Sequence, residues 1–249
     1  MIKRIHILDC GTLEIDMSYF TWKVNIGKPY RFPVWCTYVE SDEAKIMIDT
    51  GYNLENALQY YSWEKPQQSE EQRLDKQLAL IGVKPEDIDI VVITHLHFDH
   101  AGYLYLFKNA RIIVQKEELR HAYVPEPFEA IGYSRPTFDI PGLKWECVSG
   151  DQKIVDGLRT VLAPGHSAGH QIPIIDSKEL NTIIIESDVI STRANLEKHI
   201  VGGIHLDPMA QYESMLKLER IAKETGGKIF LAHDTEFYNT LKRGKEYYT

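Results

Sequence analysis

Short apolar runs separated by polar turns dominate the first fifty positions of the chain. Residues 34–40 (VWCTYVE) and 44–49 (AKIMID) flank the triplet Ser41-Asp42-Glu43, which is typical of a tight turn, so this stretch predicts a β-hairpin. Later apolar runs predict further strands at residues 90–93, 111–114, 158–162, 182–185 and 228–232.

Two helices are predicted by apolar residues at helical spacing between capping residues. Residues 69–72 (SEEQ) form a capping box, and apolar side chains over residues 74–81 follow it before Gly82, a typical stop. Asp207 is an N-cap before a proline suited to the first helical position, and that helix is expected to run to Gly226.

The order of these elements indicates the fold class. Paired strands come first, and then strands alternate with helices, which favours a layered α/β protein with helices covering sheets. Residues 123–145 are rich in proline and aromatic residues without periodicity, and they predict a long loop of the kind that often lines a site. No linker or repeat is visible, so we expect one domain over residues 1–249.

Composition narrows the classes of function. The net charge of −8 argues against a nucleic-acid-binding surface, which needs a basic patch. Cys10, Cys36 and Cys147 are scattered and form no CxxC pair, so a reducing compartment fits better than a disulfide framework. No secretory signal or membrane-spanning apolar run is visible. We therefore expect a cytoplasmic protein without nucleic-acid or membrane partners.

The stretch THLHFDHAG at residues 94–102 holds three of the 10 histidines in the chain, directly behind a predicted buried strand. His95 and His97 are expected to point to one side because side chains alternate along a strand, while Asp99 and His100 face a second point. Neutral imidazoles and carboxylates are ligands of zinc and similar metals. A buried cluster of this kind has no apolar explanation, so the stretch predicts a metal site that holds two ions.

Three other predicted strands each end in a residue that can bind a metal. His166 follows residues 158–162, Asp188 follows residues 182–185, and His233 follows residues 228–232. A single histidine after a strand is ordinarily a surface or core residue. The convergence of all three on one edge therefore carries more weight than any one of them.

The motifs HLHFDHAG, PGHSAGH, ESD and AHD, in this order, resemble the metallo-β-lactamase superfamily. The resemblance is greatest to its lactonase branch, which includes N-acyl-homoserine lactonases and 4-pyridoxolactonase. It extends over most of the chain, with FPVW at residues 32–35 and IDTG at residues 48–51, and residues 127–134 and 205–208 are similar to the pyridoxolactonase in particular. The resemblance implies an αββα four-layer sandwich with metals at one edge of the two sheets.

The resemblance also implies a set of seven ligands for two divalent ions. His95, His97 and His166 would hold one ion, Asp99, His100 and His233 would hold the other, and Asp188 would bridge them. The HxHxDH pattern favours zinc hydrolysis over a diiron redox centre, although manganese, cobalt and iron suit the same ligands. His170 is expected to orient ligands rather than bind metal, and Asp49 either does the same or is a turn residue.

One position departs from the family pattern. Many members carry a tyrosine three residues after the bridging aspartate, whereas this chain has Ser191, whose hydroxyl reaches less far. Either His205, Tyr133 or Tyr103 replaces that donor, or the substrate is bound differently. Ser191, His205 and Tyr133 are therefore the candidate substrate-binding residues.

The resemblance implies a metal-dependent hydrolase in which a metal-bridging hydroxide opens a small lactone, with Asp99 and Asp188 as the catalytic residues. An N-acyl-homoserine lactonase, and hence quorum quenching, is the favoured hypothesis. A 4-pyridoxolactonase-like hydrolase of a small aromatic lactone and a glyoxalase II-like thioesterase are the alternatives. The sequence does not decide between a monomer and a homodimer.

Overall fold

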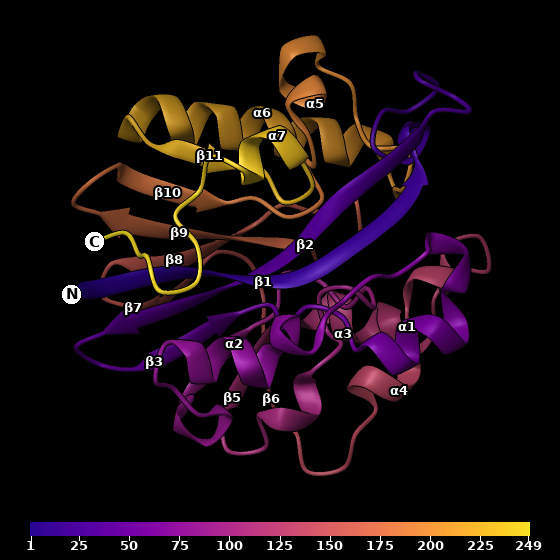
Figure 1. Ribbon diagram of the computed structural model, residues 1–249. Helices are drawn as coiled ribbons and strands as arrows, with labels where there is room; N and C mark the ends of the chain where they lie inside the picture. Colours follow the sequence, from indigo (N-terminus) through magenta and orange to yellow (C-terminus); the bar gives the residue numbers. More distant parts are fainter.

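Two β-sheets lie face to face between two layers of helices in the computed structural model, which describes residues 1–249 (Figure 1). The first sheet has the order β1 (Ile2–Asp16), β2 (Pro29–Ser41), β3 (Lys45–Ile48), β4 (Ile90–Val92), β5 (Arg111–Gln115) and β6 (Lys144–Val148). The second has the order β11 (Lys228–Phe230), β10 (Asn181–Ile185), β9 (Gln171–Ser177), β8 (Leu158–Leu162) and β7 (Gln152–Val155). The expected αββα sandwich is confirmed.

The helices form the two outer layers. Those covering the first sheet are α1 (Leu54–Tyr60), α2 (Leu74–Leu80), α3 (Lys116–Tyr123) and α4 (Arg135–Phe138), and those covering the second are α5 (Arg193–Lys198), α6 (Pro208–Thr225) and α7 (Thr235–Tyr238) (Figure 1). No helix is both long and apolar enough to cross a membrane.

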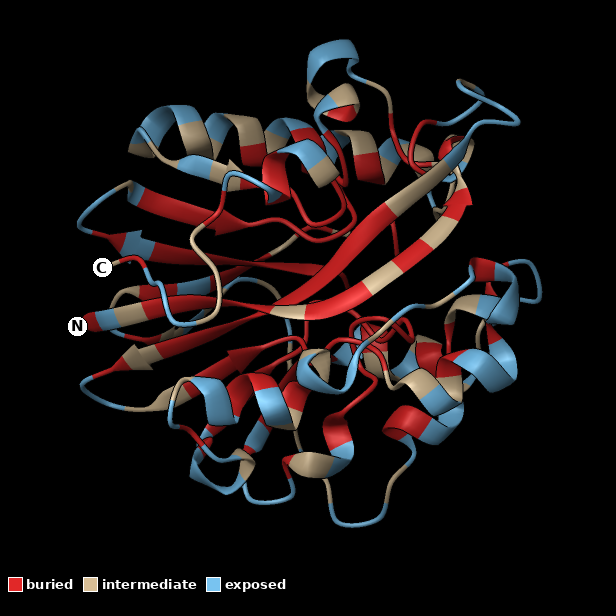
Figure 2. Cartoon of the chain, viewed as in Figure 1, coloured by how far each residue is buried: buried red, intermediate tan, exposed pale blue.

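Most strands of the first sheet are largely buried and red in Figure 2, whereas the edge strand β6 has no buried residue. Along β4, Ile90 and Val92 belong to the core between the sheets, whereas Val91 belongs to the core beneath the helices of the first outer layer. A strand with two buried faces has a continuous apolar sequence instead of an alternating one. This explains the uninterrupted apolar run at residues 90–93.

Strand direction determines where the strand ends gather. β3, β4, β5 and β6 are parallel to one another, and in the second sheet β10 and β11 are parallel. The carboxyl ends of parallel neighbours lie at the same edge of a sheet, so the segments that follow β3 and β4 are brought together, as are those that follow β10 and β11.

Most of the predicted elements are confirmed, including the hairpin of β2 and β3 and the helix that begins after Asp207. Three details differ. β1 and β2 are longer than the expected short strands because they pair along most of their length. The capping box at residues 69–72 closes a 3₁₀ turn, and α2 begins separately because Arg73 is extended. The long loop expected at residues 123–145 is wrong in part, because it contains a 3₁₀ turn (Ala130–Gly132) and α4.

Hydrogen bonds from β2 hold the segment that follows β11 against the first sheet. The indole Nε1 of Trp35 donates to the carbonyl oxygen of Ala232 at 2.7 Å. The hydroxyl of Tyr30 donates to the carbonyl oxygen of His233 at 3.0 Å. Trp35 and Ala232 are both buried. The two sheets are therefore tied together directly beside the predicted ligand His233.

Replacing Trp35 with phenylalanine keeps a ring in the core but removes the donor to Ala232. The carbonyl oxygen then lacks a partner, and we expect the free energy of unfolding, measured by urea denaturation, to fall by about 1–3 kcal/mol. Trp63→Phe is the matched control, because the Trp63 side chain is 44% exposed. Its effect should stay within about 0.5 kcal/mol. Equal losses in the two variants would contradict the role given to Trp35.

Candidate metal centre

The seven predicted ligands all follow strands and meet at one edge of the sandwich. His95, His97, Asp99 and His100 come after β4, His166 after β8, Asp188 after β10, and His233 after β11. All seven are buried. Residues more than a hundred positions apart in the sequence are thus brought together by the pairing of the strands.

The seven side chains form two adjoining groups. The first contains His95, His97, His166 and Asp188, and the second contains Asp99, His100 and His233, with the ligand atoms of each group within 4.8 Å of one another. Within the first group, Nδ1 of His97 lies 3.0 Å from Nε2 of His166. The grouping matches the division of ligands that the family resemblance implied.

Asp188 lies between the two groups. One of its carboxylate oxygens is 3.3 Å from Nε2 of both His95 and His166 and 3.4 Å from Nε2 of His100. The other is 2.9 Å from Nε2 of His233. Asp188 is the one carboxylate that lies within 4.0 Å of histidine nitrogens of both groups, as a bridging ligand must.

Hydrogen bonds on the far side of the imidazole rings fix their orientation. Nδ1 of His166 lies 3.0 Å from the carbonyl oxygen of Ile204, and Nδ1 of His233 lies 3.0 Å from that of Pro33. A carbonyl oxygen only accepts, so each Nδ1 carries the proton. In the neutral ring Nε2 then keeps the lone pair and is the nitrogen available to a metal, and in both residues it lies beside Asp188.

Asp49 connects the end of β3 to the centre. One of its carboxylate oxygens accepts the backbone N–H of Thr94 at 2.8 Å, and the other accepts the Thr94 hydroxyl at 2.7 Å and lies 2.8 Å from Nδ1 of His100. The backbone of Asp49 has a φ of 56°, a left-handed conformation that is common in turns. This agrees with the second role that the sequence analysis considered for Asp49, that of a turn residue. Asp49 is thus both a turn residue and an orienting residue.

The loop that carries the histidine motif lies directly against the turn after β3. The backbone N–H of Gly102 donates to the carbonyl oxygen of Gly51 at 2.7 Å, and that of Thr50 donates to the carbonyl oxygen of His100 at 2.7 Å. A Cβ atom on Gly102 would lie 2.4 Å from the backbone nitrogen of Asn53. Only glycine permits this approach.

The chemistry of the buried ring nitrogens fits divalent metal ions. Nε2 of His95 and Nε2 of His100 have no hydrogen-bond partner in the chain, and unpaired buried polar atoms are costly. Burial and the neighbouring imidazoles hold the pKa of His95 well below its usual range and lower that of His97 to about 3. Both rings therefore keep free lone pairs at neutral pH.

The pKa of His100 shifts in the opposite direction. Burial alone would lower it, but the carboxylates of Asp99 and Asp49 outweigh burial and raise the pKa well above its usual range. His100 therefore binds a proton strongly where no cation is bound. A metal ion at this position competes with that proton for Nε2.

Glu118 of α3 is a functional residue that the sequence reasoning missed. Its fully buried carboxylate accepts the backbone N–H groups of Leu96 and Gly169, both at 2.9 Å, and the hydroxyl of Ser167 at 2.7 Å. It thereby joins the loop of His95 and His97 to the loop of His166. The one available signal was its position four residues before Ala122, on the buried side of an otherwise polar helix.

His170 lies where the sequence analysis expected an orienting residue. Its Nε2 accepts the backbone N–H of Asp188 at 3.4 Å, and its ring centroid is 4.8 Å from that of His95. His170 therefore contacts the backbone of the bridging aspartate and the ring of a histidine in the first group.

The three candidate substrate-binding residues occupy different places. Ser191 is buried, with its hydroxyl 3.5 Å from a carboxylate oxygen of Asp188, and it lies outside the pocket. Tyr133 packs its ring against His97 at 4.8 Å and also does not line the pocket. Only His205 lines it. Tyr103 donates its hydroxyl to Gln68 instead.

A pocket of about 260 Å³ opens onto the two groups of ligands. Five of the ligands line it, namely His97, Asp99, His166, Asp188 and His233, and its apolar walls include Phe20, Phe32, Trp63, Phe128 and Ile131. Residues 128–132 contribute to it, as expected for a loop that lines a site. A Cβ atom on Gly132 would lie 2.7 Å from Nε2 of His97, so this loop closes tightly over the centre.

One further carboxylate lies in this pocket. Glu64 is only 8% exposed, and burial together with the charges of Asp99 and Asp188 raises its pKa to about 9. The sequence analysis missed it, because a single glutamate between aromatic residues gives no periodic signal.

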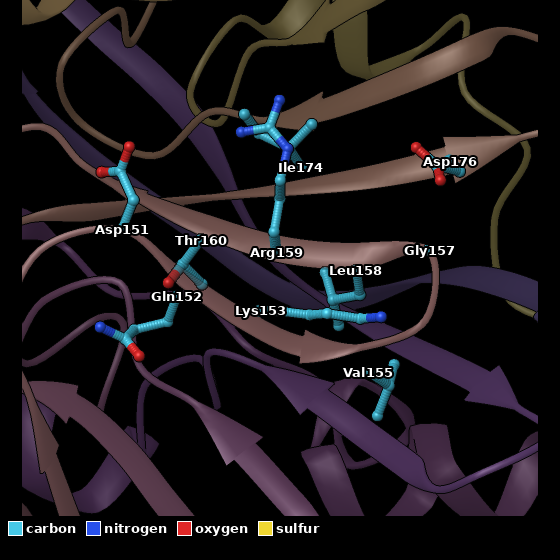
Figure 3. A pocket seen from close by; sticks show the side chains of 10 residues that line it. All are labelled: Asp151, Gln152, Lys153, Val155, Gly157, Leu158, Arg159, Thr160, Ile174 and Asp176. Carbon is cyan, nitrogen blue, oxygen red and sulfur yellow. The ribbon is translucent and has the colours of Figure 1, made fainter.

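A second hollow of about 400 Å³ lies over β7, β8 and β9 and shares no residue with the metal centre (Figure 3).

Comparison with known families agrees with this geometry. A family model described as the metallo-beta-lactamase superfamily matches residues 29–233, and the chain belongs to this superfamily. The matched stretch contains all seven candidate ligands.

Several relatives that match over the full length are lactonases. An N-acyl homoserine lactonase of Bacillus thuringiensis is 29% identical and covers 99% of both chains. The N-acyl homoserine lactonase AttM of Rhizobium johnstonii is 30% identical and covers 99% of this chain and 98% of its own. An N-acyl homoserine lactone hydrolase structure, with N-hexanoyl-L-homoserine bound at its catalytic metal centre, matches with a TM-score of 0.89 at 28% identity over 99% of both chains.

Replacing Asp49 with asparagine keeps its size but weakens the acceptor for Nδ1 of His100. We expect metal affinity to fall about 10- to 100-fold, measured by competition with a chromophoric chelator. Asp42→Asn, at the exposed turn between β2 and β3, is the control and should leave the affinity unchanged. An unchanged affinity in Asp49→Asn would show that the ring of His100 is held by other contacts.

Proposed function

We propose that this protein is a metal-dependent hydrolase that opens N-acyl-homoserine lactones, and that it thereby quenches quorum sensing. The observation that carries the proposal is the arrangement of two histidine and aspartate groups around Asp188 at the base of an apolar pocket. Full-length relatives named N-acyl homoserine lactonase support the choice of substrate. An apolar pocket beside a polar centre suits a molecule with a lactone ring and an acyl chain.

We propose two zinc ions as the cofactor. The first ion would be held by His95, His97 and His166, the second by Asp99, His100 and His233, and both by Asp188. Imidazole-rich sites with carboxylates suit zinc, while manganese, cobalt and iron accept the same ligands. The chemistry that such a pair of ions supplies when bound is activation of a water molecule and polarisation of a carbonyl oxygen.

The protein's own residues bind the lactone and move one proton. Ring opening joins the oxygen of water to the carbonyl carbon, breaks the bond to the ring oxygen and leaves that oxygen as an alcohol. One proton must therefore pass from the water to the ring oxygen. We assign its transfer to Asp99, because this carboxylate faces the pocket. The aromatic walls hold the acyl chain and exclude other water.

A lactone panel tests the proposed reaction. Zinc-loaded protein should hydrolyse acyl-homoserine lactones and release one proton per ring, followed by pH-stat titration. Simple γ- and δ-lactones, 4-pyridoxolactone and a thioester complete the panel. Turnover of the thioester without any lactone would overturn the lactonase assignment, and a preference for 4-pyridoxolactone would overturn the choice of substrate.

Replacing Asp188 with alanine removes the carboxylate shared by both groups. We expect metal content, measured by elemental analysis, to fall from two ions per chain and activity to be lost, because four histidine nitrogens lose their common neighbour. Asp176→Ala, at an exposed position of β9, is the matched control and should keep both ions. An Asp188→Ala variant that keeps both metal ions and full activity would contradict the proposed mechanism.

A further inference from the structure

The pocket contains one carboxyl group that no described role explains. Four carboxylates line it, and three of them have partners in the chain. Asp99 and Asp188 lie beside histidines of the metal centre, and Glu129 pairs with His121. The carboxylate of Glu64, which ends the 3₁₀ turn Ser62–Glu64, makes neither a hydrogen bond nor an ion pair with any other residue.

The surroundings of Glu64 offer its carboxyl group no partner. No lysine or arginine lines the pocket. The nearest cation in the sequence, Lys65, has a left-handed backbone conformation and pairs with Glu14 at the surface. The pocket lining includes apolar side chains such as Trp63 and Phe98, and the charged groups that act on Glu64 are carboxylates, namely Asp99 and Asp188. The carboxyl group is therefore buried without a hydrogen-bonding partner in the chain.

Such a placement is unfavourable for folding alone. An apolar residue of similar size would fill the same wall without the cost of burying a carboxyl group that lacks a hydrogen bond. A hydrogen-bond donor on a bound molecule would remove that cost. Glu64 lines the same pocket as five of the candidate metal ligands. A substrate group that donates a hydrogen bond to Glu64 must therefore lie close to the lactone ring that reacts.

We propose that Glu64 determines specificity by accepting a hydrogen bond from a nitrogen attached to the lactone ring of the substrate. This inference rests on the proposed lactonase function and defines its substrate class more narrowly. The shared chemistry is an N–H donor beside the ring, which either an amide of an acylated amine or a free ammonium group provides. Lactones of equal size without that donor are poorer substrates.

Three γ-butyrolactones test the role of Glu64. The first carries an acylated amine at the α carbon, the second a free amine, and the third a ketone chain in which CH₂ replaces the N–H of the first. For the zinc-loaded wild type we expect kcat/KM for the first lactone to exceed that for the third by about 10-fold or more. In Glu64→Leu this ratio should approach one, mainly through KM.

A second variant distinguishes the two kinds of donor. Glu64→Gln keeps an oxygen acceptor of the same size without the charge, so it should retain part of the preference for the amide. If the free ammonium group is the true ligand, the wild type should prefer the second lactone, and Glu64→Gln should lose that preference. Glu55→Leu, at an exposed position of α1, is the matched control and should leave every ratio unchanged.

Three results would overturn the role of Glu64, and they are distinguishable. An unchanged ratio in Glu64→Leu excludes Glu64 as the acceptor while the lactonase function stands. A loss of bound zinc in Glu64→Leu, measured by elemental analysis, assigns the residue to the metal centre instead. A wild type that holds two ions but hydrolyses none of the three lactones overturns the proposed function and this inference together.

Discussion

The carboxylate of Asp188 is the contact on which the metal centre depends. It lies within 3.4 Å of nitrogens from four histidines that come from three separate segments. Without it, the imidazoles of His95, His97 and His166 would face one another with no carboxylate in their group. The hydrogen bonds that orient the rings, such as those that His233 and His166 donate to the carbonyl oxygens of Pro33 and Ile204, direct the other ring nitrogens toward Asp188. The rest of the sandwich acts as a frame that keeps the contributing strand ends in register.

That frame is rigid because apolar cores lie on both faces of the first sheet and hold its strands in place. The loops beyond the strand ends are joined by buried polar bonds, in which Asp49 links two neighbouring turns and Glu118 links two metal-binding loops. Both oxygens of each carboxylate have hydrogen-bond partners in the chain. The two residues therefore stabilise the site and are not available to bind a substrate. Polar groups that are buried and satisfied make a geometry specific, because any displacement leaves a donor or acceptor unpaired.

Glu64 differs from these carboxylates because it has no partner in the chain. The pocket thus combines an apolar wall that suits an acyl chain with one acceptor close to the metal ligands. An apolar wall discriminates weakly between chains that differ by a methylene, whereas a buried acceptor left unpaired discriminates strongly. In the proposed lactonase, the wall would set the range of accepted chains and the acceptor would set the chemistry next to the ring.

The family resemblance implied the division of the candidate ligands into two groups, whereas the sequence by itself determined the class of fold and the candidate ligands. These features are local, because a buried strand followed by a histidine is visible as an apolar run with a polar end, and THLHFDHAG holds four ligands in six positions. Only the tertiary structure decided the roles of Glu118 and Glu64, and it placed Ser191 and Tyr133 outside the pocket. The reason is physical, because the surroundings of these side chains come from segments distant in sequence. No periodic pattern in the sequence records which groups a buried carboxyl group meets once α3 and the 3₁₀ turn Ser62–Glu64 have packed in the folded chain.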